Sequence, residues 1–148
     1  MKKILCCLLA ILSVMTFCAC GGGGTGTGGG TGDGGSSSRI DFFEIVSEIT
    51  GQNVSSSNVP YYFTIGSDNS YCNIDTNPYD LDDYSSSTAL GYIREMNDKL
   101  NLPEYVYQEM ISTSYSQGKQ TESFGSISVT WYYHPDKGLD ATYKVVQN

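Results

Sequence analysis

The side chains best suited to chemistry are one histidine and one cysteine that lie far apart in the sequence. His134 is the only histidine, and Cys72 is the only cysteine after residue 20. A thiol and an imidazole can act together as nucleophile and base, but no motif surrounds either residue. Asp136 lies two positions after His134 and could orient it, although a His-Pro-Asp turn has the same spacing for structural reasons alone. We therefore predict no catalytic residue, and we keep His134 and Asp136 as candidates for an interaction site.

Two parts of the sequence carry side chains that can bind metals. His134 has no cysteine or carboxylate partners at the spacing of zinc ligands. An acidic segment carries the hard oxygen donors that calcium prefers, namely Asp75, Asn77, Asp80, Asp82 and Asp83. It is not an EF-hand, because the sixth position is Asp80 instead of glycine and the twelfth is Ser86 instead of glutamate. An irregular calcium site stays open beside a solvated acidic loop, with Asp80, Asp82 and Asp83 as candidate residues. No metal and no cofactor are predicted.

Aromatic residues are the third candidate feature. All twelve tyrosines lie after residue 38, where they could build a recognition surface or fill a small core. Trp131, Tyr132 and Tyr133 could stack on sugars, but strand alternation turns Trp131 and Tyr133 toward the core and leaves Tyr132 outside. Core packing is therefore the favoured role, and Tyr132 is the candidate contact residue. Carboxylate pairs for glycoside hydrolysis cannot be nominated among sixteen acidic residues without a motif.

Hydrophobic periodicity predicts the elements that must position these residues. A short helix is expected over 41–50, a second from Ser87 or Thr88 to about residue 100, and a third from Pro103 to about residue 113. Residues 61–65 resemble a short strand, and 68–87 are expected to form a loop.

The C-terminal region has the clearest strand pattern. Apolar and polar residues alternate over 126–133 and again over 139–146. The intervening 134–138 segment fits a type I turn closed by a left-handed Gly138. An isolated hairpin is marginal in water, so the helices must cover its apolar face. We predict an α+β fold, with about three helices packed on a small antiparallel sheet that contains this hairpin.

The N-terminus has the parts of an export signal. Met1-Lys2-Lys3 is followed by fourteen uncharged residues over 4–17, fewer than the roughly 20 needed for a permanent membrane span. The segment Phe17-Cys18-Ala19-Cys20 resembles the lipobox of bacterial lipoproteins, although leucine is commoner than Phe17 at its position. The resemblance implies cleavage before Cys20 and lipidation of Cys20. Plain secretion and a retained membrane helix are the alternatives.

These features divide the chain into three parts: a signal peptide over 1–19, lipidated Cys20 with a flexible tether over 20–38, and a single domain over 39–148. Residues 21–38 contain eleven glycines and can bury little apolar area. With Lys2 and Lys3 removed, six basic residues face sixteen acidic ones, a formal charge of about −10. Such a surface repels nucleic acid, so no nucleic-acid partner is expected.

The stretch 113–143 resembles a segment of small, uncharacterised exported and lipoprotein domains of bacteria. The matching residues are Gly118-Lys119-Gln120-Thr121-Glu122 and the run from Val129 to Leu139. The resemblance supports a domain of this type and implies no activity.

Two functional classes follow. The favoured one is a lipid-anchored, non-catalytic module at the cell envelope or surface that binds a protein, glycan or cell-wall partner. The alternative is a small envelope hydrolase whose site forms between the 68–87 loop and His134.

Overall fold

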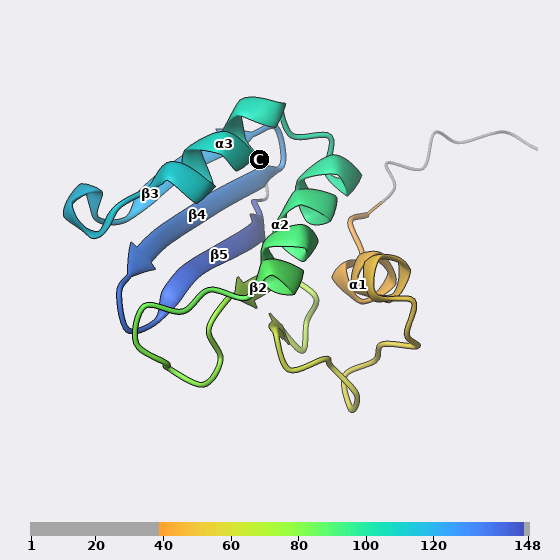
Figure 1. Cartoon of the computed structure of the whole chain (residues 1–148). Coiled ribbons are helices and arrows are strands. Elements are labelled where there is room, and N and C mark those ends of the chain that lie inside the picture. The colour runs from red at the N-terminus through yellow and green to blue at the C-terminus, as the bar shows by residue number, and fades with distance from the viewer. Residues whose placement is uncertain (1–38, 147–148) are drawn as a thin grey trace, which may run out of the picture. The chain divides into compact units, whose positions relative to one another are not determined.

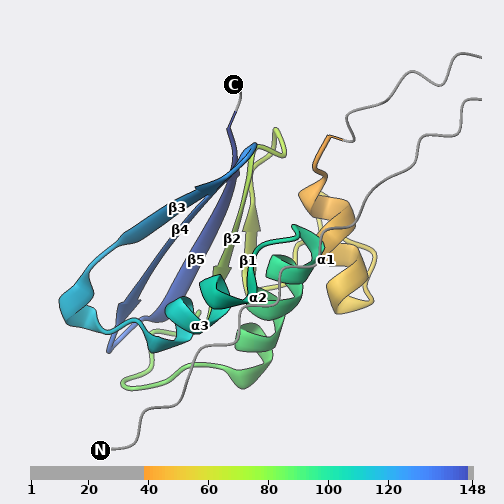
Figure 2. The same ribbon diagram turned by 90° about the horizontal axis from the view of Figure 1, so that it is seen from above.

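The computed structural model describes residues 39–146, which form three α-helices and one five-stranded antiparallel sheet. Helices α2 and α3 lie along one face of the sheet, and α1 packs beside α2 (Figures 1 and 2). The other face carries no helix from the described residues (Figure 2). The predicted α+β class is therefore confirmed.

The three helices form close to where the hydrophobic pattern predicts them. They are α1 (Phe42–Thr50), α2 (Ser87–Lys99) and α3 (Glu104–Ser112). The Asp41 carboxylate caps α1 by accepting hydrogen bonds from the amides of Phe43 and Glu44, and Gly51 ends it with φ 67°. Ser86, not Ser87 or Thr88, caps α2. Ser86 is held there because its backbone amide donates to the Thr76 carbonyl at 2.8 Å.

The sheet has the strand order β1-β2-β5-β4-β3. Its strands are β1 (Phe63–Ile65), β2 (Tyr71–Asp75), β3 (Gln120–Phe124), β4 (Ile127–His134) and β5 (Gly138–Val145). Strands β4 and β5 are the predicted hairpin. The Lys137 amide donates to the His134 carbonyl at 3.1 Å across the turn, and Gly138 has φ 70° as expected.

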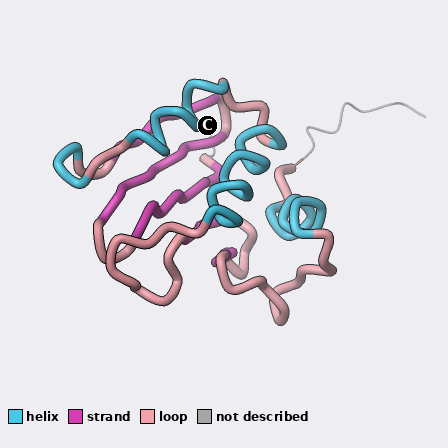
Figure 3. The backbone as a smooth tube through the Cα atoms, viewed as in Figure 1, coloured by secondary structure: helices cyan, strands magenta, loops and turns pink. Residues whose placement is uncertain are grey.

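Two strands were not predicted. Strand β2 lies inside the expected 68–87 loop, and β3 lies in a polar segment that contains one aromatic residue, Phe124. Neither has a long apolar alternation, so each depends on its neighbour: β2 pairs with β5, and β3 pairs with β4 through a tight turn at Gly125. Pairing with a strongly hydrophobic strand overrides weak local preference. Figure 3 shows that the rest of the expected loop, after β2, is irregular.

The two faces of the sheet differ sharply. The covered face carries Trp131 and Tyr143, which are almost fully buried. The Trp131 indole donates to the Thr113 hydroxyl at 2.9 Å, and the Tyr143 hydroxyl donates to Asn97 Oδ1 at 2.7 Å. The predicted inward direction of Trp131 is thus confirmed. The open face is polar, and one row crosses all five strands: Thr64, Asn73, Thr142, Thr130 and Thr121.

The bond between Trp131 and Thr113 yields a stability prediction. Thr113→Val keeps the side-chain shape but leaves the buried indole N–H without its acceptor, which should lower the free energy of unfolding by about 1–3 kcal/mol. The measurement is urea unfolding followed by tryptophan fluorescence. The matched control is Thr64→Val on the exposed edge of the sheet, expected within about 0.5 kcal/mol of the parent. Equal effects of the two changes would contradict the role assigned to this bond.

Candidate functional site

Most of the candidate residues gather at one end of the sheet, where the segment 76–86 packs on the β4–β5 turn. We call this region the loop end; it comprises residues 61–62, 76–86, 115–119 and 132–138. Asn77 is fully buried there. Its amide nitrogen donates to the carbonyls of Leu81 at 2.7 Å and Asp136 at 3.1 Å, and its Oδ1 accepts from the Leu81 amide at 3.0 Å. The segment is therefore held by a buried polar contact to the turn.

A group of aromatic rings, three exposed and one half-buried, covers part of the loop end. We call it the tyrosine cluster, and it consists of Tyr61, Tyr62, Tyr79 and Tyr84. The Tyr61 ring lies 4.1 Å from that of Tyr62 and 5.9 Å from that of Tyr79, centroid to centroid. Tyr61 is 59% exposed and Tyr79 is 70% exposed. Hydrogen bonding with Tyr62 raises the pKa of Tyr61 to about 12, and nearby Tyr79 and Tyr84 contribute to the rise.

The cluster is attached firmly to the core. The Ser86 hydroxyl donates to the Tyr62 hydroxyl at 2.9 Å, and this bond is the main cause of a lowered pKa at Tyr62. Tyr62 also meets the edge of Tyr92, whose ring lies 5.2 Å from that of buried Phe63. An aromatic path thus leads from the core to the exposed rings. The sequence prediction had assigned tyrosines mainly to the core and did not single out these four.

The acidic candidates Asp80, Asp82 and Asp83 lie between Tyr79 and Tyr84 in the sequence. Asp80 pairs with Lys137 at 3.3 Å, and the Asp83 amide donates to the Pro135 carbonyl at 3.0 Å. The Asp82 and Asp83 carboxylates are exposed and form no ion pair with a described residue. Within residues 39–146 no three side chains of histidine, cysteine, aspartate or glutamate gather as a metal site. Of the proposed calcium donors, Asn77 is engaged in its loop contacts, and Asp75 Oδ1 accepts from the Asn77 amide at 2.8 Å.

His134 and Asp136 form a local turn contact. The Asp136 amide donates to His134 Nδ1 at 3.1 Å, while the Asp136 carboxylate oxygen lies 3.8 Å from the same nitrogen. The Tyr115 ring meets the imidazole edge-on at 4.9 Å. The hydrogen bond from the Asp136 amide to His134 is part of the β4–β5 turn. Turn structure therefore explains the His-Pro-Asp spacing without a catalytic role.

Cys72 does not meet His134. It lies on β2 opposite Tyr143, which pairs with Val129, five residues from His134 along β4. At about 3.3 Å per residue, that separation is about 17 Å. The thiol is fully buried, and burial raises its pKa to about 12. The pair cannot work as nucleophile and base.

Tyr132 faces away from the buried side of the sheet, as predicted. It lines a shallow hollow of about 270 Å³ together with Tyr115, Gly118, Lys119 and Tyr133. Its neighbour across the strands is Asp140, whose Oδ1 accepts from the Asn73 amide nitrogen at 2.8 Å. Burial raises the pKa of Asp140, against the effect of the Asn73 bond, and the nearby Asp75 carboxylate raises it further.

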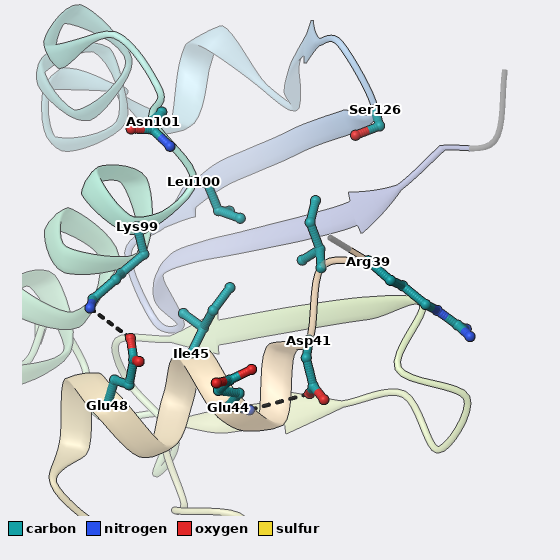
Figure 4. A pocket seen from close by; sticks show the side chains of 10 residues that line it. Arg39, Asp41, Glu44, Ile45, Glu48, Lys99, Leu100, Asn101 and Ser126 are labelled. Atoms are coloured by element: carbon teal, nitrogen blue, oxygen red, sulfur yellow. Dashed lines mark hydrogen bonds and ion pairs between the residues drawn. The ribbon is translucent and has the colours of Figure 1, made fainter. Parts of the chain in front are cut away.

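A larger groove of about 470 Å³ lies at the other side of the domain, between α1 and the end of α2. Figure 4 shows two contacts among its polar groups: Lys99 pairs with Glu48 at 2.6 Å, and Asp41 accepts from the Glu44 amide at 3.2 Å. Both contacts belong to the packing and capping of α1. The loop end, where Tyr61, Tyr79, Asp82 and Asp83 are exposed, is the stronger candidate site.

Comparison with known proteins gave no match to any family model, curated protein or solved structure. The resemblance of 113–143 to small exported domains therefore stays a prediction. The proposed lipidation site Cys20 and the tether lie outside the described residues. Among the helices of residues 39–146, none is long and apolar enough to cross a membrane.

Asp140 predicts a pH dependence of stability. The pKa of Asp140 in the folded protein is above the ordinary value of 3.8. At a pH between the unfolded-state pKa and the folded-state pKa, the folded state therefore binds more protons than the unfolded state. The stability that Asp140 contributes therefore falls as pH rises through the raised pKa. At pH 7 the cost of burying its ionised carboxylate is fully present. Asp140→Asn stays neutral and keeps an oxygen for Asn73. We expect a higher urea midpoint than the parent at pH 7, with the difference shrinking as the pH falls toward 3.8.

The control is Asp68, whose pKa is shifted in the opposite direction. Hydrogen bonds from the Ser70 hydroxyl and amide lower the pKa of the exposed Asp68, so its ionised form favours folding above the ordinary pKa and this contribution is lost in acid. Asp68→Asn should lower the midpoint at pH 7, and that difference should also shrink in acid. An Asp140→Asn protein that is less stable than the parent at pH 7 would refute the burial argument.

Proposed function

We propose that this chain is a non-catalytic binding module, held at a bacterial membrane by lipid on Cys20, whose contact surface is the loop end. The single observation that carries the binding role is the tyrosine cluster. Tyrosine supplies large contact area at a low cost in side-chain entropy and is enriched in protein interfaces. Exposed aromatic rings that rest on a fixed base are therefore suited to recognition.

The rigidity of the base supports the proposal. Asn77 links the segment that carries Tyr79 to the β4–β5 turn, and Ser86 and Tyr92 hold Tyr62. The backbone that carries the exposed rings is thus held in place before a partner binds, and pre-organisation of this kind increases affinity.

The hydrolase alternative has weaker support. It required Cys72 or the acidic segment to share a cleft with His134. Cys72 is buried about 17 Å away along the sheet, and Asp80 is engaged with Lys137. The hollow beside His134 is lined by tyrosines, Gly118 and Lys119, a set that contains no carboxylate, thiol or imidazole.

The membrane attachment is supported by the lipobox-like segment at residues 17–20. Two or three acyl chains hold a protein firmly, because each buried methylene contributes about 0.8 kcal/mol. Radiolabelled fatty acid should be incorporated into the wild-type chain but not into Cys20→Ser. The control is Cys18→Ser, which should remain labelled. Label that survives in Cys20→Ser would exclude the assignment.

The binding role can be tested by site-specific photocrosslinking in intact cells. The full chain carries p-benzoylphenylalanine in place of Tyr79, or in place of Tyr105 as a control, since Tyr105 is also exposed but lies on α3. We expect a discrete crosslinked product from position 79 that is absent from position 105. The product should weaken when Tyr61→Ala is added. No product at position 79, or equal products at both positions, would contradict a contact surface at the loop end.

A further inference from the structure

The geometry and charge of the loop end indicate its partner class. Resting on the binding role proposed above, we infer that the tyrosine cluster docks a cationic peptide segment of a partner protein, with arginine or lysine side chains over the tyrosine faces and beside Asp82 and Asp83. The tyrosine cluster provides the contact surface, and the acidic residues favour a positively charged partner.

The first argument is the arrangement of the rings. Tyr62 is inclined by 34° to Tyr61, and Tyr79 is inclined by 37° to Tyr61. They therefore do not form one flat platform of the kind on which a sugar ring lies. At a centroid distance of 4.1 Å the Tyr62 ring is stacked against Tyr61 and covers one of its faces. The accessible faces therefore belong to the exposed rings of Tyr61 and Tyr79, and the negative face of an aromatic ring attracts a cation within about 6 Å. A flexible peptide with several cationic side chains can use such faces independently.

The second argument is local charge. The loop end and the neighbouring strand ends carry six aspartates and two lysines, Lys119 and Lys137. The aspartates are Asp75, Asp80, Asp82, Asp83, Asp136 and Asp140. Lys137 is engaged by Asp80, which leaves Asp82 and Asp83 exposed and without an ion pair among the described residues. Guanidinium and ammonium groups form charge-assisted hydrogen bonds with carboxylates, whereas an acidic partner would be repelled.

The third argument is the neighbouring apolar surface. Leu81 is 51% exposed and lies between Asp80 and Asp82, two residues after Tyr79. Lysine and arginine carry long methylene stems that pack on apolar surface while the charged head stays in water. A cationic side chain therefore matches all three components of the surface: leucine, tyrosine faces and carboxylates.

The test measures binding of a fluorescein-labelled peptide of alternating arginine and glycine to the full chain in uncharged detergent, by fluorescence anisotropy. The same peptide with citrulline in place of arginine is the uncharged control. We expect the arginine peptide to bind and the citrulline peptide not to bind. Affinity should fall about two- to fivefold for each of Tyr61→Ala and Tyr79→Ala, and Asp82→Asn with Asp83→Asn should weaken binding and reduce its salt dependence.

Matched variants separate this site from general attraction to an acidic protein. Tyr105→Ala, and Asp98→Asn with Glu109→Gln, change exposed residues on α2 and α3 and should leave the affinity unchanged. Equal losses in these variants, no binding of the arginine peptide, or insensitivity to the tyrosine changes would each overturn the inference. Tighter binding of a chitosan oligosaccharide through the same residues would also overturn it, in favour of a cationic glycan.

Failure of the inference about the partner can be distinguished from failure of the proposed binding role. If position 79 still gives a discrete crosslink in cells while the arginine peptide does not bind, the contact surface stands and the partner class is wrong. If both experiments fail, the proposed function fails with the inference.

Discussion

The buried contact between the 76–86 segment and the β4–β5 turn fixes the shape of the loop end. Thr76 and Asn77 are both fully buried, and each is satisfied: the Thr76 hydroxyl accepts from the Leu139 amide at 2.8 Å, and Asn77 bonds to Leu81 and Asp136. Gly138 makes the approach possible, because a Cβ there would lie 2.6 Å from the Thr76 hydroxyl. Buried polar groups are costly when unpaired, so this segment has one satisfactory position. The exposed tyrosines owe their arrangement to it.

Much of the fold was predictable from the sequence because its strongest elements carry dense apolar patterns. Helix α1 has Phe42 and Val46 on one face, and the β4–β5 hairpin alternates around Trp131 and Tyr143. The same reasoning failed for β2 and β3. In β2 only Cys72 and Ile74 face the core, which is too short an alternation to distinguish a strand from a polar loop. Their strand character comes from register with β5 and β4, which is a tertiary property.

The candidate site was predictable only in part. His134, Asp136, Asp80 and Tyr132 were nominated from the sequence, and the structure places all of them at or beside the loop end. Tyr61 and Tyr79 were missed, since aromatic residues are usually assigned to the core. One signal was present: Tyr79 stands in a segment rich in aspartate, and Leu81 is the only other hydrophobic residue within four positions of it. An aromatic residue with so few hydrophobic neighbours in the sequence has little core face to join.

The distribution of reactive groups in the described residues favours recognition over catalysis. Three candidate side chains are engaged in structure: Cys72 is buried, His134 Nδ1 accepts a backbone amide, and Asn77 holds the loop. The exposed groups at the loop end include the rings of Tyr61 and Tyr79 and the carboxylates of Asp82 and Asp83. Catalysis needs groups whose protonation or nucleophilicity is poised for reaction, whereas recognition needs a rigid surface of defined charge and shape. The side chains of the loop end fit the second requirement, and this is the physical basis of the proposed binding role.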